Sequence, residues 1–389
     1  MVDTIYLIRH CEAEGNVYRR AHGHYDGHPM INGLAQCRAL ARRFADVPLT
    51  AVYASDLLRA KTTASYLAAS RGLAVRTDPR FREINLGIWE DMAWGELVRD
   101  HAGAYEVFNE TLWAHTIEGG ETIHETGARM LDGLRDAARA HDGAVAVVSH
   151  GMALRKTVGL LMGLPVDVHD GLRHGDNTAV TKINVARDGA MTVEYYADNG
   201  HLGELSTIAK QNWWREGNVR DAELCFDPVD LPRENELVER FRKEAWLSVY
   251  HSMDKYYPDK TAAETTRCAR QHPRSAVIVR SDEDAIGLVL LDTAYKADEG
   301  VGHISLITLD KTCRGKGLGI QLIGHAVSVY RALGRTKLHL RVADNNERAI
   351  RLYKRLGFEQ TRVEQAELRP LIVMEKPLAW DGDWAACHA

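Results

Sequence analysis

The stretch Ile5-Tyr6-Leu7-Ile8-Arg9-His10-Cys11-Glu12-Ala13-Glu14-Gly15-Asn16 opens with an apolar run that gives way to charged and polar residues. Such a run is typical of a buried strand in a parallel sheet. In an open α/β sheet, ligands bind just beyond the carboxyl ends of the strands. The stretch therefore predicts an α/β fold with Arg9 and His10 at the floor of a site and Asn16 in the loop above it. Taken alone, the Arg-His pair fits a structural histidine equally well.

Length and composition define the class of protein. The chain has 389 residues, and this favours two domains because a single core rarely supports so many. It is 26% charged with a formal net charge of -5, which gives no reason to expect nucleic acid or a membrane as the main partner. The six cysteines are scattered, no leader precedes the first strand, and no apolar segment could span a bilayer. We expect free thiols and a cytoplasmic protein.

Three histidines lie close together in the next loop, His22-Gly23-His24-Tyr25-Asp26-Gly27-His28-Pro29. A metal site is one interpretation, but a glycine-rich loop fixes no ligand geometry and no carboxylate spacing completes a ligand set. We favour a mobile rim over the site. Asn32 is then expected to be the N-cap of a helix whose buried face carries Leu34, Cys37, Leu40, Ala41 and Phe44.

Two further segments place candidate residues at strand ends and helix starts. A short strand at Ala51–Ala54 precedes a helix with Arg59 in its first turn, where an arginine opposes the helix dipole unless an anion lies nearby. This position points to a phosphate. The apolar strand Ala144–Val148 runs into His150, which stands at the N-terminus of a helix that begins near Met152.

Glu83 is a candidate proton donor. It lies in Phe81-Arg82-Glu83-Ile84-Asn85-Leu86-Gly87-Ile88-Trp89-Glu90, an otherwise apolar setting that favours a protonated carboxyl group. From the local sequence alone, a surface carboxylate is the better interpretation. A helix from about Ile123 to Ala140 follows, and strands near Thr178–Val185 and Met191–Tyr196 close this half of the chain.

Four ordered motifs in residues 1–205 resemble the histidine phosphatase superfamily, the phosphoglycerate-mutase-like group. They are Arg9-His10 with Asn16, Ser55-Asp56-Leu57-Leu58-Arg59-Ala60, Glu83 with Gly87 and Trp89-Glu90, and Ser149-His150-Gly151. The resemblance implies a three-layer α/β/α domain in which His10 becomes a phosphohistidine and Glu83 protonates the leaving oxygen. The groups it implies for binding the phosphoryl oxygens are Arg9, Asn16, Arg59, His150 and Gly151. Guanidinium groups suit phosphate oxygens, and this chemistry requires no metal.

The sequence departs from the family pattern in three places. Cys11 replaces the usual glycine after the histidine, and a thiol beside the nucleophile predicts sensitivity to oxidation. Thr62 stands where a glutamine is common. The segment between Glu83 and His150 is shorter than in the true mutases, which favours a phosphatase. A phosphoglycerate-type mutase and a cobamide-pathway (alpha-ribazole-type) phosphatase stay open as alternatives.

A second domain is expected to begin near the adjacent tryptophans Trp213 and Trp214, which gives domains 1–212 and 213–389. We expect the two tryptophans to pack at the domain interface. Strands at Ser275–Val279, Ala285–Leu291 and Gly302–Leu309 lead into Arg314-Gly315-Lys316-Gly317-Leu318-Gly319. Backbone amides of such a loop at a helix start form an anion cradle, although a tight turn alone is also compatible with it.

The same loop, followed by Val342, Asn346, Ala349, Tyr353 and Gly357-Phe358, resembles the GNAT acetyltransferase superfamily over residues 220–378. The resemblance implies an α+β domain with a mixed, mostly antiparallel sheet and acetyl-CoA as co-substrate. It implies that the amides from Arg314 to Gly319 hold the pyrophosphate, that Asn346 contacts the pantetheine, and that Tyr353 protonates the departing thiolate. Core packing of Tyr353 is the alternative. No motif fixes the general base, and His303 and Asp310 are interpreted as structural.

Together these features predict a bifunctional enzyme that acts on a small-molecule phosphomonoester and an amine, with fusion suggesting one pathway. A regulatory protein with one domain reduced to ligand sensing is an alternative of a different class. Specificity is expected in His22–Pro29, Asp91–Thr116 and Tyr250–Thr266. Within the last of these, Tyr256 and Tyr257 are candidates to line an acceptor pocket, with surface packing as the alternative.

Overall fold

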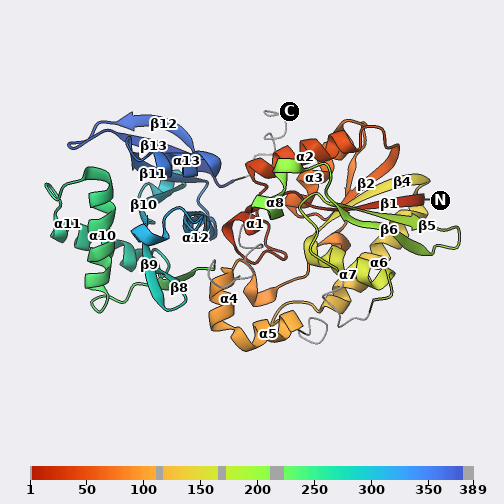
Figure 1. The fold of residues 1–389 in the computed structure, drawn as a ribbon, viewed down its shortest axis with the longest axis horizontal. Coiled ribbons are helices and arrows are strands. Elements are labelled where there is room, and N and C mark those ends of the chain that lie inside the picture. Colours follow the sequence, from red (N-terminus) through yellow and green to blue (C-terminus); the bar gives the residue numbers. More distant parts are fainter. Residues whose placement is uncertain (1, 111–116, 165–171, 211–222, 380–389) are drawn as a thin grey trace. The chain divides into compact units, whose positions relative to one another are not determined.

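The computed structural model describes residues 2–110, 117–164, 172–210 and 223–379. The chain forms two compact units, built mainly from residues 1–217 and mainly from residues 218–389 (Figure 1). The predicted boundary at 212/213, the tryptophans Trp213 and Trp214, and residues 111–116 of the second specificity loop lie outside the described residues. The boundary therefore stays a prediction. No helix within the described ranges is both long and apolar enough to cross a membrane.

Six described strands form the sheet of the first unit, in the order β3-β2-β4-β1-β5-β6. They are β1 (Val2–Arg9), β2 (Leu49–Ala54), β3 (Val75–Thr77), β4 (Gly143–Ser149), β5 (Val180–Val185) and β6 (Met191–Asp198). The first four run parallel, whereas β5 and β6 are antiparallel to their neighbours. Arg9 and Ser149 are partners in the β1–β4 register, so the residues that follow these two strands emerge side by side.

Helices cover both faces of this sheet. On one face, α2 (Ile31–Arg43) and α3 (Leu58–Ala69) share a buried core with β1, β2 and β4. On the other face, α6 (Ile123–Ala140) and α7 (Gly151–Leu161) share a second core with β1 and β4. The predicted three-layer architecture is confirmed. The shorter helices are α1 (Glu14–Tyr18), α4 (Trp94–Asp100), α5 (Ala102–Glu110) and α8 (Thr207–Lys210), and single 3-10 turns lie at Pro79–Phe81, Gly87–Trp89 and Gly203–Leu205.

Two predicted helix starts had different outcomes. The helix Ile123–Ala140 is confirmed, and a capping box between Thr122 and Glu125 fixes its start. Asn32 as the N-cap of α2 is wrong, because α2 begins at Ile31. The Asn32 side chain donates instead to Glu12 Oε2 at 3.1 Å and to the Leu205 carbonyl oxygen at 3.2 Å.

Seven described strands form the sheet of the second unit, in the order β12-β13-β11-β10-β9-β8-β7. They are β7 (Cys225–Pro228), β8 (Ala276–Ser281), β9 (Asp284–Asp292), β10 (Val301–Leu309), β11 (Lys337–Ala343), β12 (Glu359–Glu364) and β13 (Leu371–Pro377). Among these strands only β10 and β11 pair in parallel, and the other neighbours are antiparallel. The predicted mixed, mostly antiparallel sheet is confirmed. The β10–β11 register ends at Ile304 and Leu340, although both strands continue.

The helices of this unit are α10 (Asn235–Tyr250), α11 (Pro258–Gln271), α12 (Gly319–Ala332) and α13 (Glu347–Arg355). Single 3-10 turns lie at Ala297–Glu299 and Lys311–Cys313. Leu288 and Leu290 of β9 pack with Phe241 of α10 and Cys268 of α11 in one core. Tyr330 of α12 lies against Gly302 of β10, whose Cβ, if present, would be 2.5 Å from the tyrosine ring.

Candidate active sites

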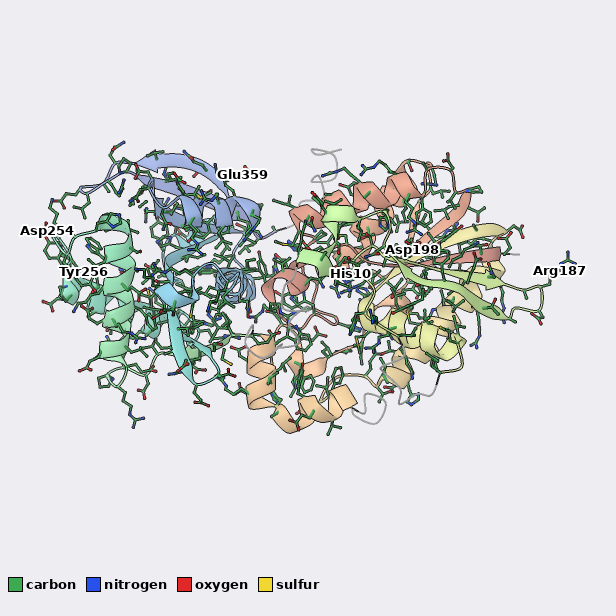
Figure 2. All side chains as sticks on the ribbon, in the orientation of Figure 1. His10, Arg187, Asp198, Asp254, Tyr256 and Glu359 are labelled. Carbon is green, nitrogen blue, oxygen red and sulfur yellow. The ribbon has the colours of Figure 1, made fainter. Side chains whose placement is uncertain are left out.

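His10 follows β1 directly, in the first unit (Figure 2). Its Nδ1 lies 2.7 Å from the Cys11 carbonyl oxygen, and because a carbonyl only accepts, Nδ1 carries the proton and Nε2 keeps its lone pair. Burial, together with Arg59 and Arg9, holds the pKa of His10 well below its usual range. A neutral imidazole in a fixed tautomer is the state in which histidine can act as a nucleophile.

Two arginines contribute positive charge: Arg9, half-buried at the end of β1, and Arg59, buried in the first turn of α3. Arg9 donates to the Gly175 carbonyl oxygen at 2.6 Å, and its Nε has no hydrogen-bond partner among the described residues. Arg59 donates to the carbonyl oxygens of Gly23 at 2.7 Å and Tyr25 at 2.9 Å. Neither arginine has a salt bridge to a carboxylate within the described part of the chain. Positive charge that no carboxylate contacts directly favours an anionic ligand.

His150 completes this cluster. Its ring centroid lies 5.0 Å from that of His10, and both of its ring nitrogens are buried with no partner among the described residues. Burial, Arg59 and His10 hold the pKa of His150 well below its usual range. Unsatisfied buried nitrogens are costly, so they indicate a place for a ligand. At the next residue, Gly151, a Cβ would lie 3.4 Å from Arg9 Nε, so the glycine leaves room for the guanidinium.

Glu83 lies beside His150, but the apolar setting predicted for it is wrong. Its Oε1 accepts from the amides of Ile84 at 3.0 Å and Ala153 at 2.8 Å, and its Oε2 accepts from the Met152 amide at 3.0 Å. Met152 and Ala153 belong to the first turn of α7, where backbone donors lack partners within the helix. The surface-carboxylate interpretation is also wrong, because Glu83 is only 8% exposed.

Asn16 contributes through its side-chain oxygen, which accepts from the Ala13 amide at 3.0 Å and from Asn177 Nδ2 at 3.3 Å. Asn177 Nδ2 also donates to the His10 carbonyl oxygen at 3.0 Å. Asn177 thus joins the Asn16 loop to the candidate nucleophile. Sequence reasoning missed this residue, because no motif surrounds it.

The histidine-rich loop is anchored, which differs from the mobile rim expected from its glycines. The Glu90 carboxylate accepts from the amides of Gly23 at 3.1 Å, His24 at 2.6 Å and Tyr25 at 2.8 Å. These bonds present the loop's carbonyl oxygens to Arg59. Within the described ranges, no group of three or more histidine, cysteine, aspartate or glutamate side chains is arranged to hold a metal ion.

An anion does stand near Arg59 at the start of α3. Asp26 Oδ1 accepts from the Leu58 amide at 2.7 Å and thereby satisfies a donor of the first helical turn. The histidine-rich loop therefore supplies, through Asp26, part of the negative charge that an arginine in the first turn of a helix requires. Close by, the Cys11 amide donates to Thr63 Oγ1 at 2.9 Å, and the Cys11 thiol is fully buried. The predicted oxidation of Cys11 stays a prediction.

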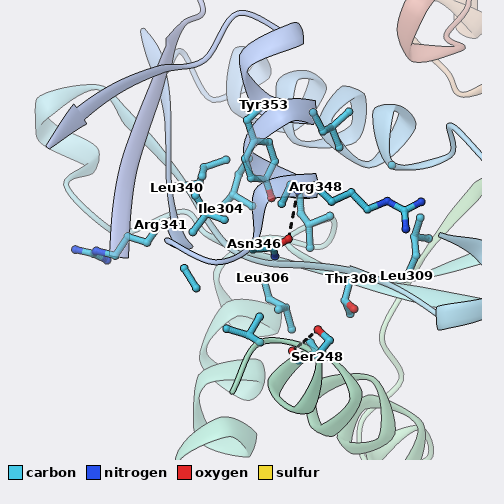
Figure 3. A pocket seen from close by; sticks show the side chains of 18 of the residues that line it. Ser248, Ile304, Leu306, Thr308, Leu309, Leu340, Arg341, Asn346, Arg348 and Tyr353 are labelled. Atoms are coloured by element: carbon cyan, nitrogen blue, oxygen red, sulfur yellow. Dashed lines mark hydrogen bonds between the residues drawn. The ribbon is translucent and has the colours of Figure 1, made fainter. Parts of the chain in front are cut away.

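The second candidate site is a cavity of about 1260 Å³ where β10 and β11 separate (Figure 3). Residues from α10, α13 and the loop before α12 also line it. Of the predicted residues, those that line the cavity are Arg314, Gly315, Gly317, Gly319, Asn346 and Tyr353, whereas Lys316 and Leu318 are not among its lining residues.

The glycine-rich loop has the backbone geometry of an anion cradle. Gly315 (φ 91°) and Gly317 (φ 87°) adopt left-handed conformations that favour glycine. The amides of Ile320 and Gln321 at the start of α12 donate to the carbonyl oxygens of Gly317 at 3.4 Å and Leu318 at 3.0 Å, so the amides left for an anion are those of the glycine-rich loop itself. The Arg314 side chain supports the loop instead of facing a ligand, because it donates to the Leu309 carbonyl oxygen at 2.8 Å and to Glu244 at 3.0 Å.

Arg348 is a site residue that sequence reasoning missed. A Cβ on Gly315 would lie 2.2 Å from its Nη2, so the guanidinium lies directly over the glycine loop. Arg348 lines the cavity, and it has no salt bridge to a carboxylate in the described part of the chain. The sequence could have indicated Arg348, because it comes two residues after Asn346 and both residues lie at the N-terminal end of α13.

Tyr353 is directed from α13 into the cavity (Figure 3). Burial raises the pKa of Tyr353 to about 12, so the hydroxyl is protonated at neutral pH. Asn346 is the N-cap of α13, and its Oδ1 accepts from the Ala349 amide at 3.3 Å. Of the two tyrosines left open between pocket lining and surface packing, Tyr256 lines the cavity, whereas Tyr257 is half exposed and is not among the lining residues.

Comparisons with known proteins agree with both halves. Residues 5–198 match the family model of the histidine phosphatase superfamily (branch 1), and residues 238–358 match that of the acetyltransferase (GNAT) family. The probable phosphoglycerate mutase GpmB of Serratia proteamaculans (strain 568) is 33% identical over 174 residues, which cover 43% of this chain and 79% of the relative. The probable phosphoglycerate mutase GpmB of Enterobacter sp. (strain 638) is 31% identical over 207 residues, which cover 51% of this chain and 94% of the relative.

Among solved structures, Bacillus stearothermophilus YhfR aligns with a TM-score of 0.50 and 29% sequence identity. The alignment covers 52% of this chain and 99% of YhfR. These matches identify a phosphatase domain joined to an acetyltransferase domain of the GNAT family. The chain belongs to the histidine phosphatase superfamily and carries a GNAT N-acetyltransferase domain in its second half.

Proposed function

We propose that the first domain hydrolyses phosphomonoesters through a phosphohistidine at His10. The observation that carries this proposal is the free Nε2 of His10 beside two guanidinium groups that have no salt bridge within the described residues. The two empty nitrogens of His150 give further support. Fixed charge around the transferring group is the main source of catalysis in phosphoryl transfer.

In the proposed reaction, His10 Nε2 attacks the phosphorus and the bond to the leaving oxygen breaks. Arg9, Arg59 and His150 bind the phosphoryl oxygens, together with the Asn16 side chain and the Gly151 amide. Glu83 gives a proton to the leaving oxygen. Water then attacks the phosphohistidine, the N–P bond breaks, and Glu83 takes a proton back.

Hydrolysis of p-nitrophenyl phosphate tests the assignment. His10→Ala should abolish turnover, and the phosphorylated protein that rapid quenching traps in the wild type should be missing from the variant. His124→Ala is the matched control, because His124 is an exposed histidine of α6 in the same domain. Equal rates for wild type and His10→Ala would overturn the nucleophile assignment.

A mutase is the alternative that the names of the relatives favour. We propose a phosphatase instead, supported by the short segment between Glu83 and His150. Incubation with 2-phosphoglycerate separates the two, since a mutase yields 3-phosphoglycerate and a phosphatase releases inorganic phosphate. We also propose that neither reaction needs a metal, so dialysis against a chelator should leave both rates unchanged.

For the second domain we propose acetyl transfer from acetyl-CoA to an amine of a small metabolite. Support comes from the glycine loop at the start of α12, the protonated Tyr353 and the cavity between the separating strands. Acetyl-CoA should raise the melting temperature of the full chain, because a ligand that binds only the folded state stabilises it. The release of CoA with a panel of amines then tests transfer, and the absence of both effects would contradict the proposal.

Fusion of the two domains suggests substrates of one pathway, and a phosphorylated amine that both sites accept would fit best. A screen of phosphorylated amines that monitors phosphate and CoA release in parallel tests this idea. If no compound serves both sites, the shared-substrate idea fails although each activity can stand. We propose a cytoplasmic setting, supported by free thiols at all five described cysteines.

A further inference from the structure

A pair of histidines joins β10 to β11 near the last point where the two strands pair. His303 and His339 are register partners, one position before Ile304 and Leu340, and the cavity opens where the strands diverge beyond them. Their Nδ1 atoms lie 2.9 Å apart, and both side chains are buried. His303 lines the cavity. The pair therefore stands at the edge of the space where the acetyl group would be transferred.

The hydrogen bonds settle which nitrogen of His303 is free. Its Nδ1 also lies 3.3 Å from the His339 carbonyl oxygen, and a carbonyl can only accept. Nδ1 of His303 is therefore the donor, and Nε2 holds the lone pair with no partner among the described residues. His339 Nδ1 accepts, so its proton is on Nε2, which is buried with no partner in the described part of the chain. A buried ring nitrogen without a hydrogen-bond partner costs free energy, which is unusual for a histidine pair whose role is packing alone.

His303 lies on the α10–α11 face of the sheet. It pairs with Asp292 of β9, and alternation puts Asp292 on the same face as Leu288 and Leu290, which pack against these helices. Gly302, the preceding residue, faces α12. Leu352 of α13 lies near the start of α12, within 3.3 Å of a Cβ placed on Gly319. Helix α13, which carries Tyr353, thus lies near α12, on the face opposite α10 and α11. The side chains of His303 and Tyr353 therefore approach the cavity from different sides.

The groups around His303 come from several elements. Burial and Arg341 of β11 lower the pKa of His303, whereas the His339 carbonyl, Asp292 of β9 and Glu264 of α11 raise it. The net direction is downward, so the imidazole is neutral at pH 7. The ring of Tyr295 packs 4.5 Å from that of His303. The two carboxylates are engaged by arginines, Asp292 by Arg267 and Glu264 by Arg242.

We propose that His303 is the general base of the acetyl transfer, with His339 as the positioning residue that holds its tautomer. The inference rests on the proposed acetyltransferase function. His303 Nε2 takes one proton from the ammonium form of the acceptor and passes it to water. The neutral amine then attacks the thioester carbon and the C–S bond breaks. After the C–N bond forms, the nitrogen loses its second proton to water. Tyr353 gives its proton to the departing thiolate and takes one back from water, so the protons balance.

The first experiment needs no acceptor. Long-range ¹H–¹⁵N spectra of the full chain labelled at histidine, assigned with His303→Gln and His339→Gln, report the tautomer of each ring. At pH 7 we expect His303 to be neutral and protonated at Nδ1, and His339 to be protonated at Nε2. A His303 ring that is charged, or protonated at Nε2, cannot accept a proton at Nε2 and would overturn the proposal.

The second experiment compares two kinds of nucleophile with acetyl-CoA. Hydroxylamine is already uncharged at pH 7, whereas ethanolamine, putrescine, glucosamine and tyramine carry ammonium groups. His303→Gln should lower kcat for the fastest ammonium acceptor roughly 10²-fold or more, since general bases contribute on this order. Transfer to hydroxylamine and the KM for acetyl-CoA should stay nearly unchanged. A kcat of His303→Gln that equals the wild-type kcat with the ammonium acceptor would contradict the proposed role of His303.

Controls separate this inference from the function on which it rests. His339→Gln should lower kcat less than His303→Gln does and should displace the acid limb of the pH–rate profile, which lost packing alone would not do. His272→Gln, at a histidine outside the cavity lining, should behave as wild type. If the wild type transfers acetyl to no probe and does not bind acetyl-CoA, the proposed function fails. If only the His303→Gln effect is missing, the inference alone fails.

Discussion

The two candidate sites offer different groups to an anion. In the candidate phosphatase site the positive charge comes from two side chains, Arg9 and Arg59, which backbone carbonyl oxygens hold in place. In the acetyltransferase site the donors are backbone amides of a glycine loop, with the Arg348 guanidinium above them. A phosphoryl group is small and needs a few fixed charges, whereas a long cofactor needs an extended surface, and the cavity of about 1260 Å³ provides one.

This difference determines where substitutions should matter. Backbone amides survive the replacement of a side chain, so single substitutions at the cofactor loop have bounded effects. The two guanidinium groups have no substitute, and their loss also leaves backbone carbonyl oxygens without donors. We therefore expect larger losses of activity from charged residues of the first site than from those of the second.

The largest effect in this comparison is expected for Arg59→Ala. Loss of one preorganised donor to a transition state typically costs about 10²–10³-fold in rate. Arg59 is buried and makes no salt bridge to a carboxylate among the described residues. We expect kcat/KM for p-nitrophenyl phosphate to fall by about this factor. Acetyl transfer by the same protein should be unchanged.

Arg82→Ala is the matched control for Arg59→Ala. Arg82 comes from the same domain and donates to Asp56 at 2.6 Å, so its charge is already compensated. Its removal should change kcat/KM only a few-fold. Equal losses in the two variants would contradict the idea that a guanidinium without a direct salt bridge, and not arginine in general, binds the phosphoryl group. Circular dichroism of both variants verifies that they are folded.

In the second site, the largest effect of a single side chain is expected for Tyr353→Phe. The substitution removes only the hydroxyl that would protonate the thiolate, and general acids contribute on the order of 10²-fold. We expect kcat to fall by about this factor with the KM for acetyl-CoA unchanged. Tyr257→Phe is the control, because Tyr257 is half exposed and outside the cavity lining. A raised KM with an unchanged kcat would assign Tyr353 to cofactor binding instead.

The contrast between the sites also explains what the sequence could predict. His10 and His150 follow strands with clear apolar runs, and parallel strands that are neighbours end at the same edge, so their proximity was foreseeable. The glycine loop was foreseeable for a similar reason, because left-handed conformations at Gly315 and Gly317 need glycine. The local pattern of residue types predicts such features.

The environments of individual side chains were not foreseeable in this way. Glu83 has apolar neighbours in sequence, yet its partners are amides of α7, which lies about 70 residues later in the chain. Asn177 reaches the His10 carbonyl oxygen from 167 residues away. Such contacts depend on how helices pack over the sheet, and a single sequence does not encode that packing in any short pattern.

The pH dependence of the first site offers a smaller effect. Burial, Arg59 and Arg9 lower the pKa of His10 well below 6.5, so the imidazole stays neutral while the pH falls through 6.5. We expect kcat/KM for p-nitrophenyl phosphate, corrected for substrate ionisation, to change less than about twofold between pH 7.5 and pH 6. A histidine with the ordinary pKa would lose activity with a midpoint near 6.5. An acid limb at that pH would show that His10 is not shielded as the structure indicates.

Among the three test substitutions, Arg59→Ala, Tyr353→Phe and Arg348→Ala, the smallest effect is expected for Arg348→Ala, and it sharpens the comparison most directly. The Arg348 guanidinium lies over Gly315 at the cofactor cradle, so its loss should weaken acetyl-CoA binding. The amides of the loop remain, and solvent screens a charge near the surface, so we expect KM for acetyl-CoA to rise roughly five-fold with kcat unchanged.

Lys354→Ala on the same helix α13 is the control for Arg348→Ala, because Lys354 is exposed and outside the cavity lining. Raising the salt concentration should weaken acetyl-CoA binding more in the wild type than in Arg348→Ala, since salt screens the charge that the variant lacks. A loss in Arg348→Ala as large as that of Arg59→Ala would mean that side-chain charge dominates both sites. The distinction between a backbone cradle and a side-chain cluster would then be wrong.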